Sequence, residues 1–364
     1  MSIRHLTISG LVLAAIAAPA AAQPKGDAAL IAEAVQILPE DLRAGATVVA
    51  YDPATGARRV VRQGTNFVEC QPVDPADGFA RCYHKLLGPR RDLEAKLKAE
   101  KKTEEQISQA IAAAMKDGSL PQMPQGLMSY RFYGKRDRIQ NLWVMSLPNA
   151  TPESVGVSTT SQRSAALEGR GLPWMMLPGT PGAHIMIPIN PKPGKSTITD
   201  VAADPIAQAT LPLPGDLRAG ATVYTYDANG DRKVLRKGTN QIECTPKGDD
   251  GFTWCYNVAG AARRDLSAKL RAQKKTDKEI QQAMAEATKA GTIKPTAFGT
   301  MSYRLYGKPD RIQLLWVLSV PNATPETIGV STASQREEAL EQKGVPWLML
   351  PGTPGAHIMI PINK

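Results

Sequence analysis

Apolar and polar positions alternate in short runs from about residue 46 onward, in a pattern typical of β-strands. Four such runs are rich in β-branched and aromatic residues: ATVVAYD (46–52), RRVVRQGT (58–65), NFVEC (66–70) and FARCY (79–83). Asp-Pro-Ala-Thr-Gly and Gly-Thr-Asn stand between them, and residues of these types favour hairpin turns. The pattern therefore predicts a small antiparallel sheet.

A helical period follows this predicted sheet. RRDLEAKLKAEKK (90–102) predicts one helix, and TEEQ (103–106) is a capping box that predicts the start of a second helix. Four apolar residues of the second helix recur at helical spacing: Ile107, Ala110, Ile111 and Ala114. We expect this apolar face to pack on the sheet. Further strands are predicted at NLWVMSL (141–147), PWMML (173–177) and AHIMIPI (183–189).

The whole order of predicted elements occurs twice in the 364-residue chain. DLRAGATVVAYD (41–52) returns as DLRAGATVYTYD (216–227), and RRDLEAKL (90–97) returns as RRDLSAKL (263–270). Repeats of a solenoid are only about 20 to 50 residues long, so a complete domain has been duplicated, and we expect each copy to have its own core.

We therefore predict an α+β fold made of two tandem copies of a small antiparallel-sheet domain with an inserted helical pair. The predicted domains are residues 29–190 and 204–363. A segment rich in Pro, Gly, Ser and Thr, residues 191–203, reads as the linker between them.

The N-terminus has the features of a secretory signal peptide, predicted to span residues 1–22. Arg4 provides the positive charge, residues 6–18 are apolar, and small residues precede a cleavage site after Ala22. The apolar run is shorter than the roughly 20 residues needed to cross a bilayer, and we predict no transmembrane segment. These features predict a periplasmic or secreted protein.

Each copy contains two cysteines, Cys70 and Cys82 in the first and Cys244 and Cys255 in the second. In an oxidising compartment an even number of cysteines at repeated positions favours disulfides, and we choose the pairings 70 with 82 and 244 with 255. A zinc site is disfavoured because neither pair has the short spacing of thiolate zinc ligands.

The formal net charge is +10 and the isoelectric point is near 9.4. The basic residues are scattered among acidic ones with few aromatics between them, which does not favour nucleic acid as a partner. In an exported protein this charge indicates an anionic envelope polymer, or another exported protein, as the partner. Most of the charge nevertheless reads as ordinary solvated surface.

The stretch PWMMLPGTPGAHIMIPIN (173–190) returns as PWLMLPGTPGAHIMIPIN (346–363). A hairpin centred on Thr180 places Met176 opposite His184 and Trp174 opposite Met186. Because side chains alternate along a strand, these four residues share one face of the hairpin. The second copy repeats the set as Trp347, Met349, His357 and Met359.

Two interpretations of this Trp/Met/His/Met face compete. Thioether sulfur and imidazole nitrogen suit Cu(I), with an indole lying over the bound cation. The candidate ligands are Met176, His184, Met186, Met349, His357 and Met359, and the candidate cation caps are Trp174 and Trp347. A strand that is apolar on both faces is also what a buried strand looks like, and we favour this packing interpretation.

A hydrolytic site centred on the histidine that both copies share is a further hypothesis. It would need Ser129, Ser158 or Ser161 as the nucleophile and an acid such as Asp137. No nucleophile-elbow or zinc-hydrolase motif supports it. The first hypothesis is therefore a non-catalytic envelope or binding protein, followed by a Cu(I)-binding protein and then a hydrolase.

Two segments carry a resemblance: RQGTNFVEC (62–70), which precedes a second cysteine, and the terminal PGTPGAHIM. They resemble an uncharacterised family of small exported bacterial proteins, with Arg-x-Gly-Thr-Asn before a Cys-containing loop and a terminal Gly-Thr-Pro-x-Ala-His-x-Met. The family usually has an aromatic residue beside the Asn, where Phe67 and Gln241 stand here. The resemblance implies export and the domain boundaries, and it implies no activity.

Overall fold

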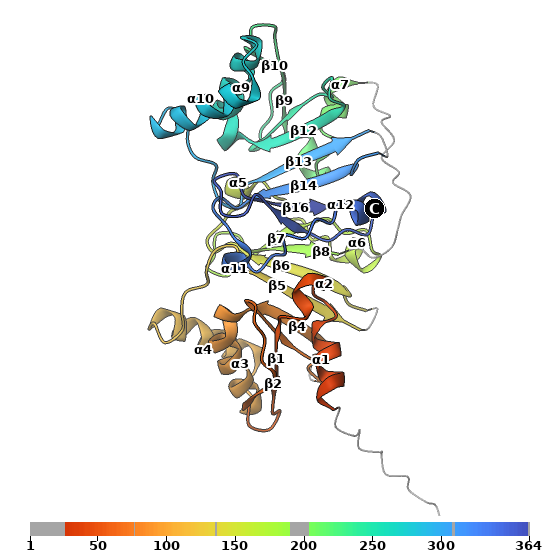
Figure 1. Ribbon diagram of the computed structural model, residues 1–364, viewed down its shortest axis with the longest axis vertical. Coiled ribbons are helices and arrows are strands. Elements are labelled where there is room, and N and C mark those ends of the chain that lie inside the picture. Colours follow the sequence, from red (N-terminus) through yellow and green to blue (C-terminus); the bar gives the residue numbers. More distant parts are fainter. Residues whose placement is uncertain (1–25, 76, 135–136, 190–203, 308–309, 363–364) are drawn as a thin grey trace, which may run out of the picture.

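The computed structural model describes residues 26–75, 77–134, 137–189, 204–307 and 310–362 (Figure 1). The predicted signal peptide, residues 1–22, and the predicted linker, residues 191–203, lie outside the described residues. Each copy forms one eight-stranded sheet with a helical pair inserted into it, which confirms the α+β class and the tandem duplication. We call residues 26–189 lobe A and residues 204–362 lobe B.

The two sheets have the same strand order, β2-β1-β3-β4-β5-β6-β8-β7 in lobe A and β10-β9-β11-β12-β13-β14-β16-β15 in lobe B. The strands of lobe A are β1 Thr47–Tyr51, β2 Arg58–Arg62, β3 Val68–Gln71, β4 Phe79–His84, β5 Met128–Tyr133, β6 Asn141–Ser146, β7 Trp174–Met176 and β8 His184–Pro188. Those of lobe B are β9 Thr222–Tyr226, β10 Arg232–Arg236, β11 Ile242–Thr245, β12 Phe252–Asn257, β13 Met301–Tyr306, β14 Leu314–Ser319, β15 Trp347–Met349 and β16 His357–Pro361.

The helices also correspond between the lobes. Lobe A contains α1 Asp27–Val35, α2 Glu40–Arg43, α3 Gly88–Ala99, α4 Glu104–Lys116, α5 Pro152–Val155 and α6 Arg163–Leu167. Lobe B contains α7 Pro205–Ala209, α8 Gly215–Arg218, α9 Ala261–Ala272, α10 Asp277–Lys289, α11 Pro325–Ile328 and α12 Arg336–Leu340. None of the helices in the described part of the chain is long and apolar enough to cross a membrane.

The sheet is mixed rather than purely antiparallel. The turn at Asp-Pro-Ala-Thr-Gly joins β1 and β2 as a hairpin, as predicted. Gly-Thr-Asn does not, because β3 pairs with β1 in parallel and β2 is left at the edge. The chain crosses close to β1 at this point: a Cβ on Gly64 would lie 2.3 Å from the Thr47 nitrogen. The hairpin predicted between β2 and β3 is therefore wrong.

The second helix begins where its capping box predicts. Thr103 Oγ1 accepts a hydrogen bond from the Gln106 N–H, and the Gln106 side chain accepts one from the Thr103 N–H. The apolar face of α4, however, packs on α3, where Ile107 and Ile111 form a small cluster with Leu93 and Leu97. The expectation that this face packs on the sheet is wrong, since α3 lies against it instead.

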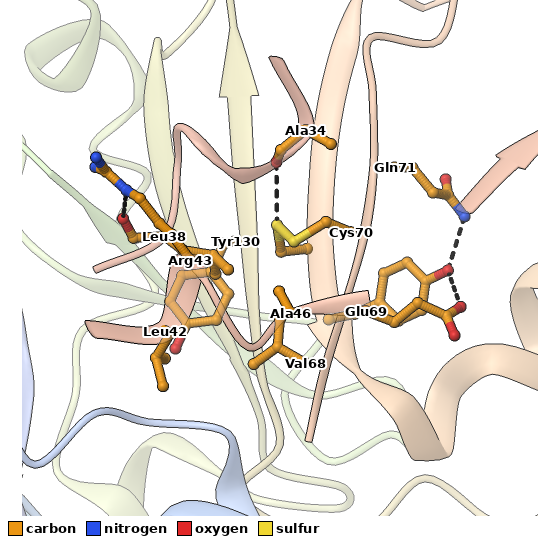
Figure 2. The surroundings of a disulfide bond; sticks show 12 residues. Ala34, Leu38, Leu42, Arg43, Ala46, Val68, Glu69, Cys70, Gln71 and Tyr130 are labelled. Carbon is orange, nitrogen blue, oxygen red and sulfur yellow. Dashed lines mark hydrogen bonds between the residues drawn. A yellow bond between two sulfur atoms is a disulfide. The ribbon is translucent and has the colours of Figure 1, made fainter. Parts of the chain in front are cut away.

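Both predicted disulfides are formed, Cys70–Cys82 and Cys244–Cys255. Each joins neighbouring strands at directly paired positions and is fully buried. Figure 2 shows the lobe A disulfide beside Ala34 of α1, whose carbonyl oxygen lies 3.3 Å from Cys82 Sγ. The cross-links thus lie beneath the N-terminal helix of each lobe.

The two lobes share one hydrophobic core. A single cluster of buried residues includes Tyr130, Trp143 and Met145 of lobe A together with Tyr303, Trp316 and Leu318 of lobe B. The expectation that each copy has its own core is therefore wrong. The sequence pattern shows which face of each strand is apolar, but it does not show that the two apolar faces meet.

Hydrogen bonds join the lobes reciprocally. The Tyr130 hydroxyl donates to the Gly329 carbonyl, and the Tyr303 hydroxyl donates to the Gly156 carbonyl. Burial raises the pKa of both hydroxyls, which stay protonated as donors. The Ser158 hydroxyl donates to the Asp216 carboxylate of the opposite lobe, and the Ser331 hydroxyl donates to the Asp41 carboxylate at 2.6 Å. These contacts are reciprocal, like those between two subunits related by a two-fold axis. The duplicated chain therefore folds as an internal dimer.

His84 and Asn257 occupy equivalent positions in this interface. His84 Nδ1 accepts from the Leu86 N–H, so Nε2 carries the proton and donates to the Glu326 carbonyl at 2.7 Å. Asn257 Nδ2 donates to the Glu153 carbonyl at 2.8 Å. The two different side chains make the same contact with the opposite lobe.

Candidate functional site

The paired strands β7 and β8 position the Trp/Met/His/Met face of lobe A. Met176 pairs with His184 and Trp174 pairs with Met186, which is the predicted register. The alternate residues Met175, Ile185 and Ile187 belong to the shared core. Strands β15 and β16 repeat this pairing in lobe B. The Trp/Met/His/Met face therefore lies on the side of each sheet that turns away from the other lobe.

Exposure differs among the four residues of this face. The Met176 side chain is 38 % exposed, His184 and Met186 are half-buried, and Trp174 is only 2 % exposed. In lobe B, Met349, His357 and Met359 are half-buried, and Trp347 is 2 % exposed. The tryptophans are therefore buried, as the packing interpretation predicts. The methionines and histidines of this face are at most partly buried.

In each lobe, one ring nitrogen of the shared histidine forms a hydrogen bond with the backbone. His184 Nδ1 lies 2.7 Å from the Gly182 carbonyl oxygen, and His357 Nδ1 lies 2.8 Å from the Gly355 carbonyl oxygen. Because a carbonyl only accepts, Nδ1 carries a proton in both rings, so in a neutral ring the lone pair lies on Nε2. Burial, with a further contribution from Arg131, lowers the pKa of His184, so its imidazole is neutral at pH 7. This is the protonation state that a metal ligand requires.

The tryptophan of this face packs under a short helix. In lobe B, Trp347 forms a cluster with Ile312, Leu315 and Ala339 of α12, and Met349 and Met359 pack against it. The indole N–H groups of Trp174 and Trp347 have no hydrogen-bond partner among the described residues. Packing therefore accounts for the apolar contacts of the thioethers, whereas the imidazole Nε2 makes no hydrogen bond among the described residues.

No group of three His, Cys, Asp or Glu side chains in the described part of the chain could hold a metal ion. A metal at the Trp/Met/His/Met face would therefore depend on thioether sulfur together with one imidazole. That donor set suits a soft monovalent ion and does not suit Mg²⁺ or Ca²⁺.

The residues considered for hydrolysis are not brought together. Ser158 bonds Asp216 across the lobe interface, and Ser129 Oγ donates to the Val144 carbonyl. Asp137 is exposed, and His184 Nδ1 bonds a carbonyl rather than a carboxylate. Among the described residues, no contact forms the chain of nucleophile, base and acid that a triad needs.

The Arg-x-Gly-Thr-Asn segment has an internal structural role. The Arg62 guanidinium donates to the Ala46 and Arg43 carbonyls, and Asn66 Nδ2 donates to the Leu42 carbonyl at 2.9 Å. Arg236 and Asn240 make the same contacts in lobe B. The segment fastens the short helix α2 or α8 to the sheet, and its polar groups are occupied by the backbone.

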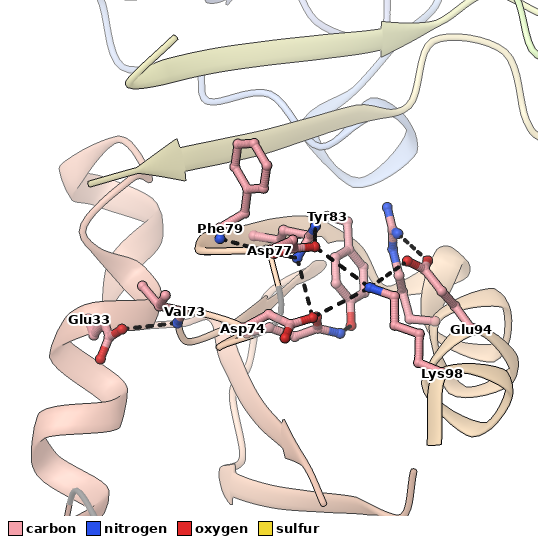
Figure 3. A network of polar contacts seen from close by, with 11 residues as sticks. Glu33, Val73, Asp74, Asp77, Phe79, Tyr83, Glu94 and Lys98 are labelled. Atoms are coloured by element: carbon pink, nitrogen blue, oxygen red, sulfur yellow. Dashed lines mark hydrogen bonds and ion pairs between the residues drawn. The ribbon is translucent and has the colours of Figure 1, made fainter. Parts of the chain in front are cut away.

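A polar network on lobe A was missed by sequence reasoning. Figure 3 shows Glu94 and Lys98 of α3 meeting Asp74 and Asp77 of the loop between β3 and β4. Lys98 Nζ lies 3.4 Å from Asp74 Oδ2, 3.6 Å from Asp77 Oδ2 and 3.4 Å from Glu94 Oε1. Arg81 pairs with Asp77, and Arg91 pairs with Glu94 at 2.6 Å. A residue-by-residue comparison of the two copies would have found it, because lobe B lacks several of these side chains.

Comparison of this chain with protein-family models, with curated proteins and with solved structures found no match.

Proposed function

We propose that this chain is a non-catalytic binding protein that acts outside the cytoplasm and binds its ligand on the outer faces of the two sheets. The observation that supports this proposal is the reciprocal bonding of the lobes, in which tyrosine and serine hydroxyls of each lobe bond the other. The two outer faces are therefore held in a fixed relation, which favours an extended or repeating ligand over two independent ones.

Two further observations support export and an anionic partner. Both disulfides are formed and buried, as expected in an oxidising compartment. The formal charge of +10 favours attraction to anionic polymers of the cell envelope.

Sedimentation with an insoluble anionic cell-wall polymer tests the proposal. We expect the mature protein to pellet with the polymer at low salt and to be released at about 0.5 M salt, where screening shortens the range of charge interactions. An uncharged polysaccharide of the same particle size is the control. A protein that stays in the supernatant at every salt concentration, or that pellets equally with the uncharged control, would contradict the proposal.

A Cu(I)-binding function is the second candidate, and one observation favours it. In both lobes the imidazole Nδ1 forms a hydrogen bond with a backbone carbonyl. This bond orients the ring so that Nε2 can serve as a metal ligand on the face that also carries two methionines. Hydrogen bonding of the second ring nitrogen is the usual arrangement of a metal-ligating histidine.

Anaerobic titration of the purified mature protein with Cu(I) separates the two candidates. The copper candidate predicts two tightly bound ions per chain, and one ion lost in each of His184→Ala and His357→Ala. His84→Asn, which changes a histidine to the residue that lobe B already uses, is the matched control. Fewer than one tightly bound ion per lobe, or binding that survives both alanine substitutions, eliminates the copper candidate, and the alanine variants would then change stability alone.

A further inference from the structure

Arg304 of β13 has no anionic partner among the residues that the structure describes. Its Cζ lies 5.1 Å from the ring centroid of Phe252 and 5.5 Å from that of Trp254. Arg311 lies over Phe252 as well, at 5.5 Å. In the part of lobe B that the structure describes, no ion pair joins Arg304, Arg311 or Arg336 to a carboxylate. The guanidinium groups of Arg304 and Arg311 thus lie over aromatic rings, and the charge of Arg336 acts on Arg304.

The environment of Arg304 disfavours its charge. Burial, followed by the nearby Arg311 and Arg336, lowers the pKa of Arg304 to about 10. Its Nε is buried and has no hydrogen-bond partner among the described residues. A partly buried guanidinium is stabilised by an anion that reaches it. Asp250, in the turn before β12, accepts the Phe252 N–H at 3.0 Å.

Lobe A has carboxylates near the equivalent position. Arg131 corresponds to Arg304, and burial, followed by Arg91 and Arg81, lowers its pKa to about 10 as well, but here Glu94 and Asp77 act in the opposing direction. Three substitutions separate the lobes: Arg81, Asp74 and Glu94 of lobe A stand where lobe B has Trp254, Gly248 and Ser267. Lobe A therefore supplies its own carboxylates, and lobe B has replaced two of them and added an indole.

We propose that lobe B binds the carboxylate of an acidic sugar at Arg304, with the sugar ring lying on the neighbouring aromatic surface. The rings of Trp254 and Tyr256 are stacked, with centroids 5.7 Å apart and planes 7° from parallel, and both side chains are half-buried. A guanidinium fork recognises a carboxylate through paired N–H donors, and flat half-exposed aromatic rings offer an apolar surface beside it. The inference rests on the proposed binding function and names the chemistry of its ligand.

Tryptophan fluorescence provides a local probe for this site. Trp254 is half-buried, whereas the other four tryptophans are at most 2 % exposed. We expect a trimer of galacturonate to shift the emission of the mature full-length protein and to protect it from iodide quenching. The methyl-esterified trimer, which has lost its charges, is expected to bind at least about tenfold more weakly, because it cannot accept charge-assisted hydrogen bonds from the guanidinium.

Two variants test the site by different routes. Arg304→Gln removes the cation, and Ser267→Glu restores the carboxylate that lobe A carries; each is expected to lower the affinity by about tenfold or more. Arg131→Gln, the equivalent change in lobe A, is the matched control and is expected to leave the affinity unchanged. Near-ultraviolet circular dichroism of each variant checks that the fold is retained.

Several results would overturn the inference. The first is equal affinity of the wild type, Arg304→Gln and Ser267→Glu for the trimer. The second is equal binding of the charged and the esterified trimers. The third is tighter binding of a glutamate oligopeptide or of sulfate than of the sugar. If Arg304→Gln still pellets with the anionic cell-wall polymer as the wild type does, the proposed function stands and only this site fails. If neither protein pellets, the proposed function fails as well.

Discussion

At the scale of single residues, the two copies show which positions keep a contact and which change it. His84 and Asn257 differ in chemistry but make the same bond to the opposite lobe. Phe67 stacks on His84, whereas Gln241 in the equivalent place donates to the Pro152 carbonyl at 2.9 Å. The interface thus tolerates changes of residue type as long as its carbonyl groups are satisfied.

His84 makes the interface sensitive to acid. Burial, with a smaller contribution from Lys85, lowers the pKa of His84 below its usual value of 6.5. A lowered folded-state pKa means that the stabilisation is complete above pH 6.5 and is lost as the pH falls from 6.5 through the folded-state pKa. Protonation would also place an N–H on Nδ1, where the Leu86 N–H now donates.

We therefore predict that urea unfolding shows a loss of stability between pH 7.5 and pH 5, and that His84→Asn makes this loss smaller. Asparagine does not titrate, and it already performs the same contact in lobe B. His184 also has a lowered pKa and keeps its contribution in the variant, so some pH dependence is expected to remain. An identical pH dependence in both proteins would contradict the role given to His84.

At the scale of elements, the sequence predicts local structure well where the determinants are close together in the chain. The β7–β8 register follows from a short turn between alternating residues, and the start of α4 follows from Thr103 and Gln106, three positions apart. The parallel pairing of β3 with β1 is not predictable in this way, because nothing in the Gly-Thr-Asn turn specifies which side of β1 the chain takes. The Trp/Met/His/Met face was predictable for the same reason as the register. The contacts of Arg304 with Phe252 and Trp254 were not, because these residues are far apart in the sequence.

The crossing from β2 to β3 depends on Gly64. A Cβ there would meet the backbone of Thr47 at 2.3 Å and of Ala46 at 2.4 Å, and backbone cannot rotate away as a side chain can. We predict that Gly64→Ala lowers the free energy of unfolding by about 1 to 3 kcal/mol, as overpacking does. Urea denaturation measures this change.

Gly215→Ala is the control for that substitution, because nothing lies within 4 Å of a Cβ at Gly215. It is expected to leave the midpoint of unfolding near the wild-type value. If Gly64→Ala unfolds at the same urea concentration as Gly215→Ala, the close approach of the two segments is not a determinant of the fold.

At the scale of the whole molecule, the two lobes are one folding unit. The shared core and the paired tyrosine bonds connect residues that are far apart in sequence, such as Tyr130 and Gly329. Such contacts have no signature in local apolar patterns, which is why separate cores were expected.

A cut in the chain tests this unity. We predict that the protein cleaved between residues 190 and 203 still elutes from gel filtration as one species with the mass of both halves, because the lobes keep their shared core. Addition of urea above the unfolding midpoint should separate the halves. Two folded species, each with the mass of a single half in native buffer, would show that the lobes are independent.

The exchange of hydroxyl-to-carbonyl bonds between the lobes has an evolutionary consequence. A protein with only one copy of this unit would present both the donor hydroxyl and the acceptor carbonyl on the same surface. It would therefore assemble as a symmetric homodimer, in which any substitution appears twice. Joining two copies in one polypeptide makes the assembly independent of concentration. It also frees one lobe to lose carboxylates that the other retains, here Asp74 and Glu94 of lobe A.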